Sequence, residues 1–257
     1  MSILIDADFS VYKSCASSED EIDFGDDVIL VTSRFSEAYK RVEREIKSIR
    51  ECLGNVDDVV LFFSSPNNFR KEIYPDYKGH RNRKKPCGYK RVINKLRESY
   101  EVVMMPTLEA DDALGIWQTR EPGEHIIASP DKDMRQIPGK LFDLKEEVVT
   151  IEPEEARRWH YLQTMAGDCT DGYSGIPGVG MKRASILLDE EGCSWQTVLN
   201  AYKDKGLTEE DALMNARLAR ILQHSDYDYG KEQPIPWTPP AASIGTDDGT
   251  AIQDETD

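Results

Sequence analysis

The feature that most limits the fold of this 257-residue chain is a series of short apolar runs that alternate with helical patterns. Runs of this length predict buried strands, at 2–5, 59–63, 101–105 and 125–129. Apolar residues at helical spacing predict helices at about 34–53, 88–99 and 109–117, with Ser33 as N-cap of the first. Alternating strands and helices indicate an α/β fold with a mostly parallel central sheet flanked by helices.

Beyond residue 140 the pattern changes from mixed to helical. Two strand-like runs, 140–144 and 148–151, are followed by predicted helices at 153–165 and 181–188, and Ser194 and Thr208 resemble N-caps of two more. We therefore expect three regions: an α/β core at 1–150, a helical region at 151–224, and a Pro-rich, acidic tail at 225–257. Composition predicts that the tail is disordered.

The charge of the chain is distributed unevenly. The net charge is −16, which by itself argues against a nucleic-acid partner, yet a basic strip at 70–97 holds eleven Lys or Arg and only two acids. Tyrosines interleave with the cations of the strip, and this combination is typical of single-strand binding. A solvated loop is the alternative. The cations expected to contact nucleic acid are Arg70, Lys84 and Lys85.

Cysteine usage and hydropathy bear on the compartment. The five cysteines are widely spaced and form no C-x-x-C motif, so reduced thiols are expected. The sequence shows neither a long apolar span nor a secretory signal. We expect a cytoplasmic monomer.

Carboxylates follow several of the predicted strands or begin nearby helices. In parallel sheets ligands bind beyond the carboxyl ends of the strands, so these acids are expected to converge. Taken singly, each segment also has a structural explanation, as helix first turns or as turn residues. Taken together, oxygen ligands without His or Cys favour two Mg²⁺ ions, with Mn²⁺ as a substitute. The candidate ligands are Asp6, Asp8, Glu109, Asp111, Asp112, Asp131, Asp133, Asp168 and Asp171.

A glycine-rich loop precedes the helix predicted at 181–188. Its sequence, G-I-P-G-V-G-M-K-R, predicts a helix–hairpin–helix element whose backbone N–H groups contact DNA phosphates without reading bases. Gly178 and Gly180 allow close approach of the backbone, and Lys182 and Arg183 add positive charge. A plain interhelical turn is the alternative, and a K⁺ ion on the loop carbonyls is an open possibility.

Several motifs together resemble the 5′ nuclease superfamily, which includes the flap endonucleases, and most closely the 5′→3′ exonucleases of T-odd bacteriophages. The resemblance covers about residues 3–237 and rests on I-D-A-D, F-R-K-E-I-Y-P-D-Y-K-G-H-R, K-K-P-C-G-Y, L-E-A-D-D, S-P-D-K-D-M-R-Q-I-P and M-A-G-D-C-T-D-G-Y-S-G-I-P-G-V-G.

The resemblance implies a PIN-like sheet domain that cleaves phosphodiesters in DNA with a 5′ end, and RNA in RNA–DNA hybrids. Acting in phage replication or processing, such a protein would work in the bacterial host cytoplasm. Lys78 and Arg81 would contact the scissile phosphate, and the resemblance assigns the metals to every candidate acid except Asp8.

One departure from the family concerns a metal-binding Asp that usually follows the second strand. Ser65 falls at that place here, and Asp8 is a candidate to compensate. Two rival readings stay open: a DNA-structure-binding protein with weakened catalysis, and a PIN-type ribonuclease.

Overall fold

A six-stranded sheet forms the centre of the protein, whose computed structural model describes residues 1–81, 84–145 and 147–240. Its strand order is β5-β4-β1-β6-β7-β8, and every pair is parallel except β7–β8. This arrangement confirms the predicted mostly parallel sheet. The strands are β1 (Ser2–Asp6), β4 (Val59–Phe62), β5 (Glu101–Val103), β6 (His125–Ala128), β7 (Gly139–Phe142) and β8 (Val148–Ile151).

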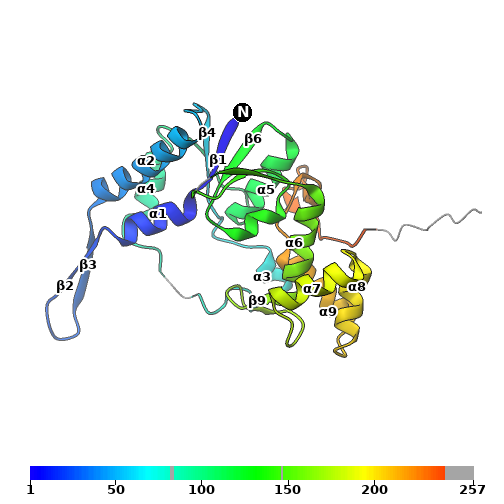
Figure 1. Ribbon diagram of the computed structural model, residues 1–257. Helices are drawn as coiled ribbons and strands as arrows, with labels where there is room; N and C mark the ends of the chain where they lie inside the picture. Colours follow the sequence, from blue (N-terminus) through cyan, green and yellow to red (C-terminus); the bar gives the residue numbers. More distant parts are fainter. Residues whose placement is uncertain (82–83, 146, 241–257) are drawn as a thin grey trace, which may run out of the picture.

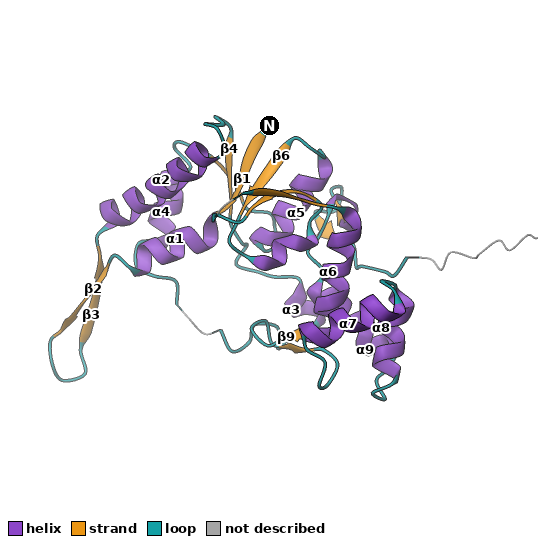
Figure 2. Ribbon diagram, in the orientation of Figure 1, coloured by secondary structure: helices purple, strands orange, loops and turns teal. Residues whose placement is uncertain are grey.

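Helices cover both faces of the sheet, which explains why the inner strands are apolar throughout (Figures 1 and 2). Successive strand residues point to opposite faces, so Ile3 and Ile5 join one core while Leu4 joins the other. The first core is closed by α1 (Ala7–Ala16), α2 (Phe35–Cys52) and α4 (Tyr89–Leu96). The second is closed by α5 (Ala110–Arg120), the 3₁₀ helix η1 (Lys132–Gln136) and α6 (Pro153–Ala166).

Two elements near the N-terminus were not predicted, and one predicted cap is wrong. Helix α1 begins directly after β1, and a hairpin of β2 (Glu19–Asp23) and β3 (Ile29–Ser33) projects from the body (Figure 1). Ser33 ends β3, and Arg34 is the N-cap of α2. The acidic, exposed β2 lacks the buried apolar face by which a strand is recognised in a sequence.

The remaining helices pack around α6 at one end of the sheet, in a separate apolar cluster. The side chains of Ser194 and Thr208 accept hydrogen bonds from the N–H groups of Thr197 and Asp211, which confirms both predicted N-caps. The helices of this cluster are α7 (Met181–Glu191), α8 (Trp195–Lys203) and α9 (Glu209–Ala219), and a separate short helix is α3 (Arg70–Ile73).

The prediction that order is lost after about 225 is wrong for residues 225–240. This segment forms the 3₁₀ helix η2 (His224–Asp226) and a small hairpin of β11 (Tyr227–Asp228) and β12 (Gln233–Pro234). Trp237 then packs edge-on against His160 and Trp195. Aromatic packing therefore anchors a segment whose proline content suggested disorder; residues 241–257 lie outside the described residues.

None of the helices in the described ranges combines the length and the hydropathy needed to cross a membrane.

Candidate active site

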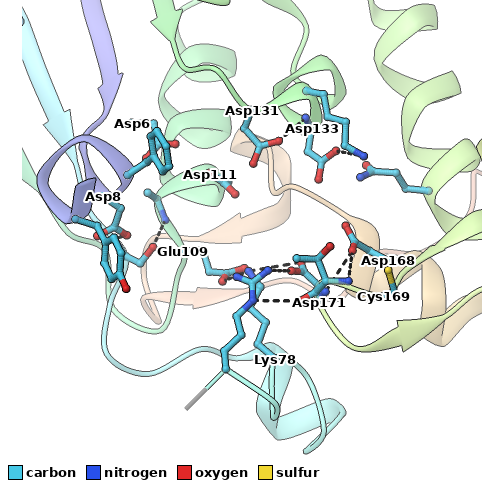
Figure 3. A pocket seen from close by; sticks show the side chains of 18 of the residues that line it. Asp6, Asp8, Lys78, Glu109, Asp111, Asp131, Asp133, Asp168, Cys169 and Asp171 are labelled. Atoms are coloured by element: carbon cyan, nitrogen blue, oxygen red, sulfur yellow. Dashed lines mark hydrogen bonds and ion pairs between the residues drawn. The ribbon is translucent and has the colours of Figure 1, made fainter. Parts of the chain in front are cut away.

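A cleft of about 670 Å³ opens at the edge of the sheet where β1 and β6 end (Figure 3). Parallel strands end at the same edge, so acids that follow them are brought together although they are far apart in the sequence. The predicted acids that line the cleft are Asp6, Asp8, Glu109, Asp111, Asp131, Asp133, Asp168 and Asp171. Asp112 does not line it.

Asp6 is one of the cleft acids without an ion-pair partner among the described residues. It is the last residue of β1, and its carboxylate accepts a hydrogen bond of 3.2 Å from the Ser129 hydroxyl at the end of β6. Burial, followed by the negative charges of Asp8 and Asp131, raises the pKa of Asp6 to about 7. The group therefore resists ionisation near neutral pH unless a cation approaches.

Burial and neighbouring acids also raise the pKa values of Asp111 and Asp133, although Lys132 lies 3.9 Å from Asp133. Burial, and then the charges of Asp6 and Glu109, raise the pKa of Asp111 well above its usual range. Burial and Asp131 raise the pKa of Asp133 to about 6. The buried Oδ1 of Asp133 has no hydrogen-bond partner among the described residues. A carboxylate oxygen without a hydrogen bond, set among neighbouring acids, is a donor that a hard divalent cation would satisfy.

The carboxylates of the cleft do not converge closely enough to coordinate a metal ion directly as a group. Within the described ranges, no three His, Cys, Asp or Glu side chains form a ready metal-binding group. Mg²⁺ retains several water ligands, so a cleft of this width fits ions held partly through water.

The opposite wall of the cleft is compensated by protein cations. Lys78 forms ion pairs with Glu109 and, at 3.5 Å, with Asp171. Burial alone would raise the pKa of Glu109, but the charges of Lys78 and Arg70 lower it to about 2. Tyr77 is 2% exposed, and its hydroxyl bridges the Glu109 and Asp171 carboxylates at 2.9 Å each. The tyrosines of the basic strip are predicted to face nucleic acid, but Tyr77 is buried. Its partners lie 32 and 94 residues away in the sequence, so the neighbouring residues do not reveal this role.

Two predicted site residues are instead partners in the interior. The guanidinium of Arg70 binds both oxygens of Asp112 at 2.7 and 2.8 Å, and the two residues are 3% and 0% exposed. Arg70 also donates to the backbone carbonyls of Leu218 and Arg220 at 3.0 and 2.5 Å. The structure therefore contradicts Arg70 as a DNA contact and Asp112 as a metal ligand, because each satisfies the other away from solvent.

Two further cations of the basic strip, Arg81 and Lys85, line the cleft. Arg81 contacts Asp171 at 2.8 Å, and Lys85 lies 3.7 Å from Asp8. The side chains of Arg81 and Lys85 are 43% and 57% exposed, so both can reach an incoming anion. Lys84 is exposed. Residues 82–83 of the strip lie outside the described residues.

The loop after β4 presents a different serine from the one expected. Ser64 lines the cleft, donates its N–H to Asp8 at 2.9 Å, and accepts the N–H of Ala110 on its hydroxyl. The N–H of Ser65 is bonded to the carbonyl of Leu108, and Ser65 does not line the cleft. Asp8 therefore supplies the carboxylate next to this loop, from the first turn of α1.

The glycine-rich loop has the geometry of an exposed turn that begins a helix. Ile176 and Val179 are buried, whereas Gly178, Gly180, Lys182 and Arg183 are exposed. Gly178 has a φ of 77°, which other residues rarely adopt, and Gly180 is the N-cap of α7. The apolar side chains fix the turn, and its backbone and cations face solvent.

Sequence comparison places the chain among the nucleases. It belongs to the family described as 5'-3' exonuclease, N-terminal resolvase-like domain, which matches residues 3–159. The exodeoxyribonuclease of Enterobacteria phage T3 is 28% identical over 92% of this chain and 92% of its own length. The exonuclease of Escherichia phage T7 is 28% identical over 92% of this chain and 93% of its own.

Solved structures share the fold. The phage T5 D15 protein, co-crystallised with metal ions, has a TM-score of 0.63 and 14% identity, covering 85% of this chain and 88% of that one. The T5 5'-exonuclease with bound zinc has a TM-score of 0.62 and 16% identity, with coverage of 85% and 89%. At this identity the likeness concerns the fold, and it confirms the α/β architecture.

Proposed function

We propose that the protein hydrolyses phosphodiester bonds from the 5′ ends of duplex DNA, in the 5′→3′ direction, during phage DNA replication or processing. The observation that carries the proposal is the cleft in which burial and neighbouring acids raise the pKa values of Asp6, Asp111 and Asp133. A polyanionic substrate could enter such a cleft only if cations accompany it. Flaps, and RNA in RNA–DNA hybrids, are further substrates of the proposed activity.

The residues proposed to hold two Mg²⁺ ions are the cleft acids, and Asp112 is excluded by its pairing with Arg70. Asp6, Asp111, Asp131 and Asp133 would hold the ions from one side of the cleft, and Glu109, Asp168 and Asp171 from the other, in part through water. When bound, a pair of divalent ions supplies an activated water and neutralises charge on the phosphate. All donors are oxygens, which favours Mg²⁺ or Mn²⁺ over Zn²⁺ in this chain.

Lys78 and Arg81 are proposed to hold the scissile phosphate. Burial acts against the charge of Lys78, but Glu109 and Asp171 outweigh it and raise its pKa, so its ammonium stays protonated. A preorganised cation in a partly desolvated site stabilises the charge that develops on a phosphate. Arg81, at the rim, would orient the same group from the solvent side.

The exposed loop before α7 is proposed to bind the DNA backbone. Gly178 and Gly180 would present N–H groups to a phosphate, with Lys182 and Arg183 beside them. Met181, the first residue of α7, lines the cleft, so DNA on this loop would lead directly to the acids. Lys84 and Lys85 would guide the strand on the other side. A K⁺ ion on the loop carbonyls would be compatible with this role.

A cleavage time course tests the function. Duplexes labelled at the 5′ or the 3′ end are incubated with Mg²⁺ and with EDTA, and an RNA–DNA hybrid is assayed in parallel. We expect early release of labelled 5′ nucleotides, progressive shortening of the 3′-labelled strand, and no cleavage in EDTA. Cleavage of single-stranded RNA alone would favour the ribonuclease reading.

Asp131→Asn is the matching variant, with Asp204→Asn, an exposed acid at the end of α8, as its control. Asp131→Asn should lose cleavage and keep DNA binding, whereas the control should cleave normally. Tight binding by wild type without cleavage in Mg²⁺ or Mn²⁺ would contradict the proposal and favour a structure-binding protein.

A further inference from the structure

A second hollow lies directly beside the acidic cleft. It is a groove of about 350 Å³ between α1, α2 and the turn that follows β7. Ile49 and Phe142, 4% and 5% exposed, belong to the core beneath it, and Leu144 adds to its apolar lining. None of the residues assigned to the proposed chemistry lies in this groove.

Phe9 and Pro130 separate the groove from the cleft. Phe9 lines both hollows and is 53% exposed, and it follows Asp8 of the cleft directly in the sequence. Pro130 lines the groove and precedes Asp131 of the cleft. A nucleotide that extends from the acidic cleft into the groove would therefore contact the ring of Phe9.

The charged residues around the groove have no net charge, and this determines the kind of ligand that the groove can bind. Lys13 forms an ion pair with Glu45 at 3.3 Å, and Lys13 also lies 5.4 Å from the centre of the Phe9 ring. Asp143 and Lys145 are the other charged residues that line it. A neutral, apolar groove does not attract a phosphate, but it offers a flat aromatic face to a nucleobase.

The direction of the DNA strand across the cleft indicates which nucleobase would enter the groove. The loop proposed to bind duplex DNA lies before α7, and its neighbour Met181 lines the cleft, as do Asp168 and Cys169. Asp6 and Asp8 lie on the other side of the cleft from Asp168 and Asp171 (Figure 3). Duplex held at α7 therefore directs the part of the strand beyond the cut phosphate toward Phe9.

We propose that this groove binds the nucleobase of the 5′-terminal nucleotide, with Phe9 as its stacking platform. The inference rests on the proposed 5′→3′ cleavage and adds a subsite to it. The groove provides stacking without base-specific readout, so it would accept every base and prefer the larger purine rings.

The first test combines a protein change with a substrate change. Cleavage rates are compared for wild type and Phe9→Ala on duplexes that carry either a normal or an abasic 5′-terminal nucleotide. We expect the abasic change to slow wild type on the order of tenfold, the size of one lost base stack, and to slow Phe9→Ala hardly at all. Phe9→Trp should restore the wild-type difference.

Phe24→Ala is the control, because Phe24 is 66% exposed in the projecting segment between β2 and β3 and does not line the cleft. This variant should retain the wild-type sensitivity to the abasic change. Equal abasic penalties in wild type and Phe9→Ala would overturn the inference and leave the proposed cleavage intact.

A second test needs no cleavage and so separates the two proposals. A duplex with an unpaired 5′-terminal 2-aminopurine is titrated with protein in EDTA, and the fluorescence of the base is measured. Stacking should lower the fluorescence with wild type, Phe9→Trp and Phe24→Ala, and much less with Phe9→Ala. Identical fluorescence for wild type and Phe9→Ala at saturation would overturn the inference whatever the activity.

Discussion

The two walls of the cleft are built from similar acids but differ in how their charge is balanced. On one wall, burial and the shared neighbour Asp131 raise the pKa values of Asp6, Asp111 and Asp133. On the other, Lys78 and Arg70 neutralise Glu109, whose pKa is lowered to about 2. The comparison shows that protein cations balance the charge of one wall, whereas the acids of the other wall keep an excess of negative charge that the proposed metal ions would neutralise.

The difference begins with two consecutive residues of α5. Asp111 lines the cleft among other acids, whereas Asp112 is fully buried against Arg70. Neighbouring residues on a helix point in directions about 100° apart, so one faces the cleft and the other the interior. Adjacent carboxylates of the same motif are therefore divided between the proposed metal site and a buried ion pair.

The largest expected effect is on stability, from Asp112→Asn. The change replaces the carboxylate that binds the buried Arg70 at 2.7 and 2.8 Å with a neutral amide, and breaking a buried ion pair costs about 3–5 kcal/mol. Urea unfolding in EDTA should show a loss of this size. A loss below about 1 kcal/mol would mean that Arg70 finds another partner and that the Arg70–Asp112 ion pair does not stabilise the compensated wall.

Asp111→Asn should have the opposite profile. We expect cleavage to fall roughly 100-fold or more, because a proposed metal ligand is lost, while stability in EDTA is unchanged or higher. The rate with saturating Mg²⁺ and the urea midpoint give the two values. Asp111→Asn with wild-type activity would remove this residue from the proposed metal site.

A pH series sharpens the comparison through Asp6→Asn. The pKa of Asp6 is about 7 in the folded protein against an ordinary value of 3.8. Because the folded pKa is raised, the ionised group destabilises the fold as pH rises above 3.8, and its full cost is reached above about 7.

In EDTA, the variant and wild type should therefore be equally stable near pH 4. The variant should be more stable by about 1–2 kcal/mol at pH 8, a discounted fraction of the shift. Mg²⁺ should abolish this advantage, because the cation would neutralise Asp6 in wild type. A difference that is independent of pH would show that Asp6 ionises freely without metal.

The smallest effect is expected outside both walls, at Lys182. Lys182→Ala should weaken DNA binding a few-fold for every sequence and reduce the slope of log affinity against log salt by about 1. Fluorescence anisotropy at several salt concentrations measures this, with Lys203→Ala on α8 as the control. An unchanged slope would indicate that the loop before α7 is only a turn between helices.

Much of the site could be predicted from the sequence, because the patterns that specify it involve residues close together in the chain. Apolar runs followed by acids specify Asp6 and Asp131 at strand ends, and parallel pairing brings these ends together. The glycine loop before α7 was also recognisable, since its spacing reflects a turn that few other residues could form.

Other features depend on partners that are remote in the sequence. Arg70 belongs to a basic strip and resembled a DNA contact, but carbonyls about 150 residues away complete its buried environment. In the same way Trp237 anchors a segment that composition alone assigned to disorder. Neither outcome is visible in a window of neighbouring residues.

By itself, the sequence determined the parallel sheet, the edge at which the acids gather and the glycine loop, because hydrophobic periodicity and backbone sterics act over a few residues. Only the tertiary structure decided which acids are balanced by cations, which serine faces the cleft, and that Phe9 stands between two hollows. Charge compensation and burial depend on the distances between side chains, and packing sets those distances across the whole fold.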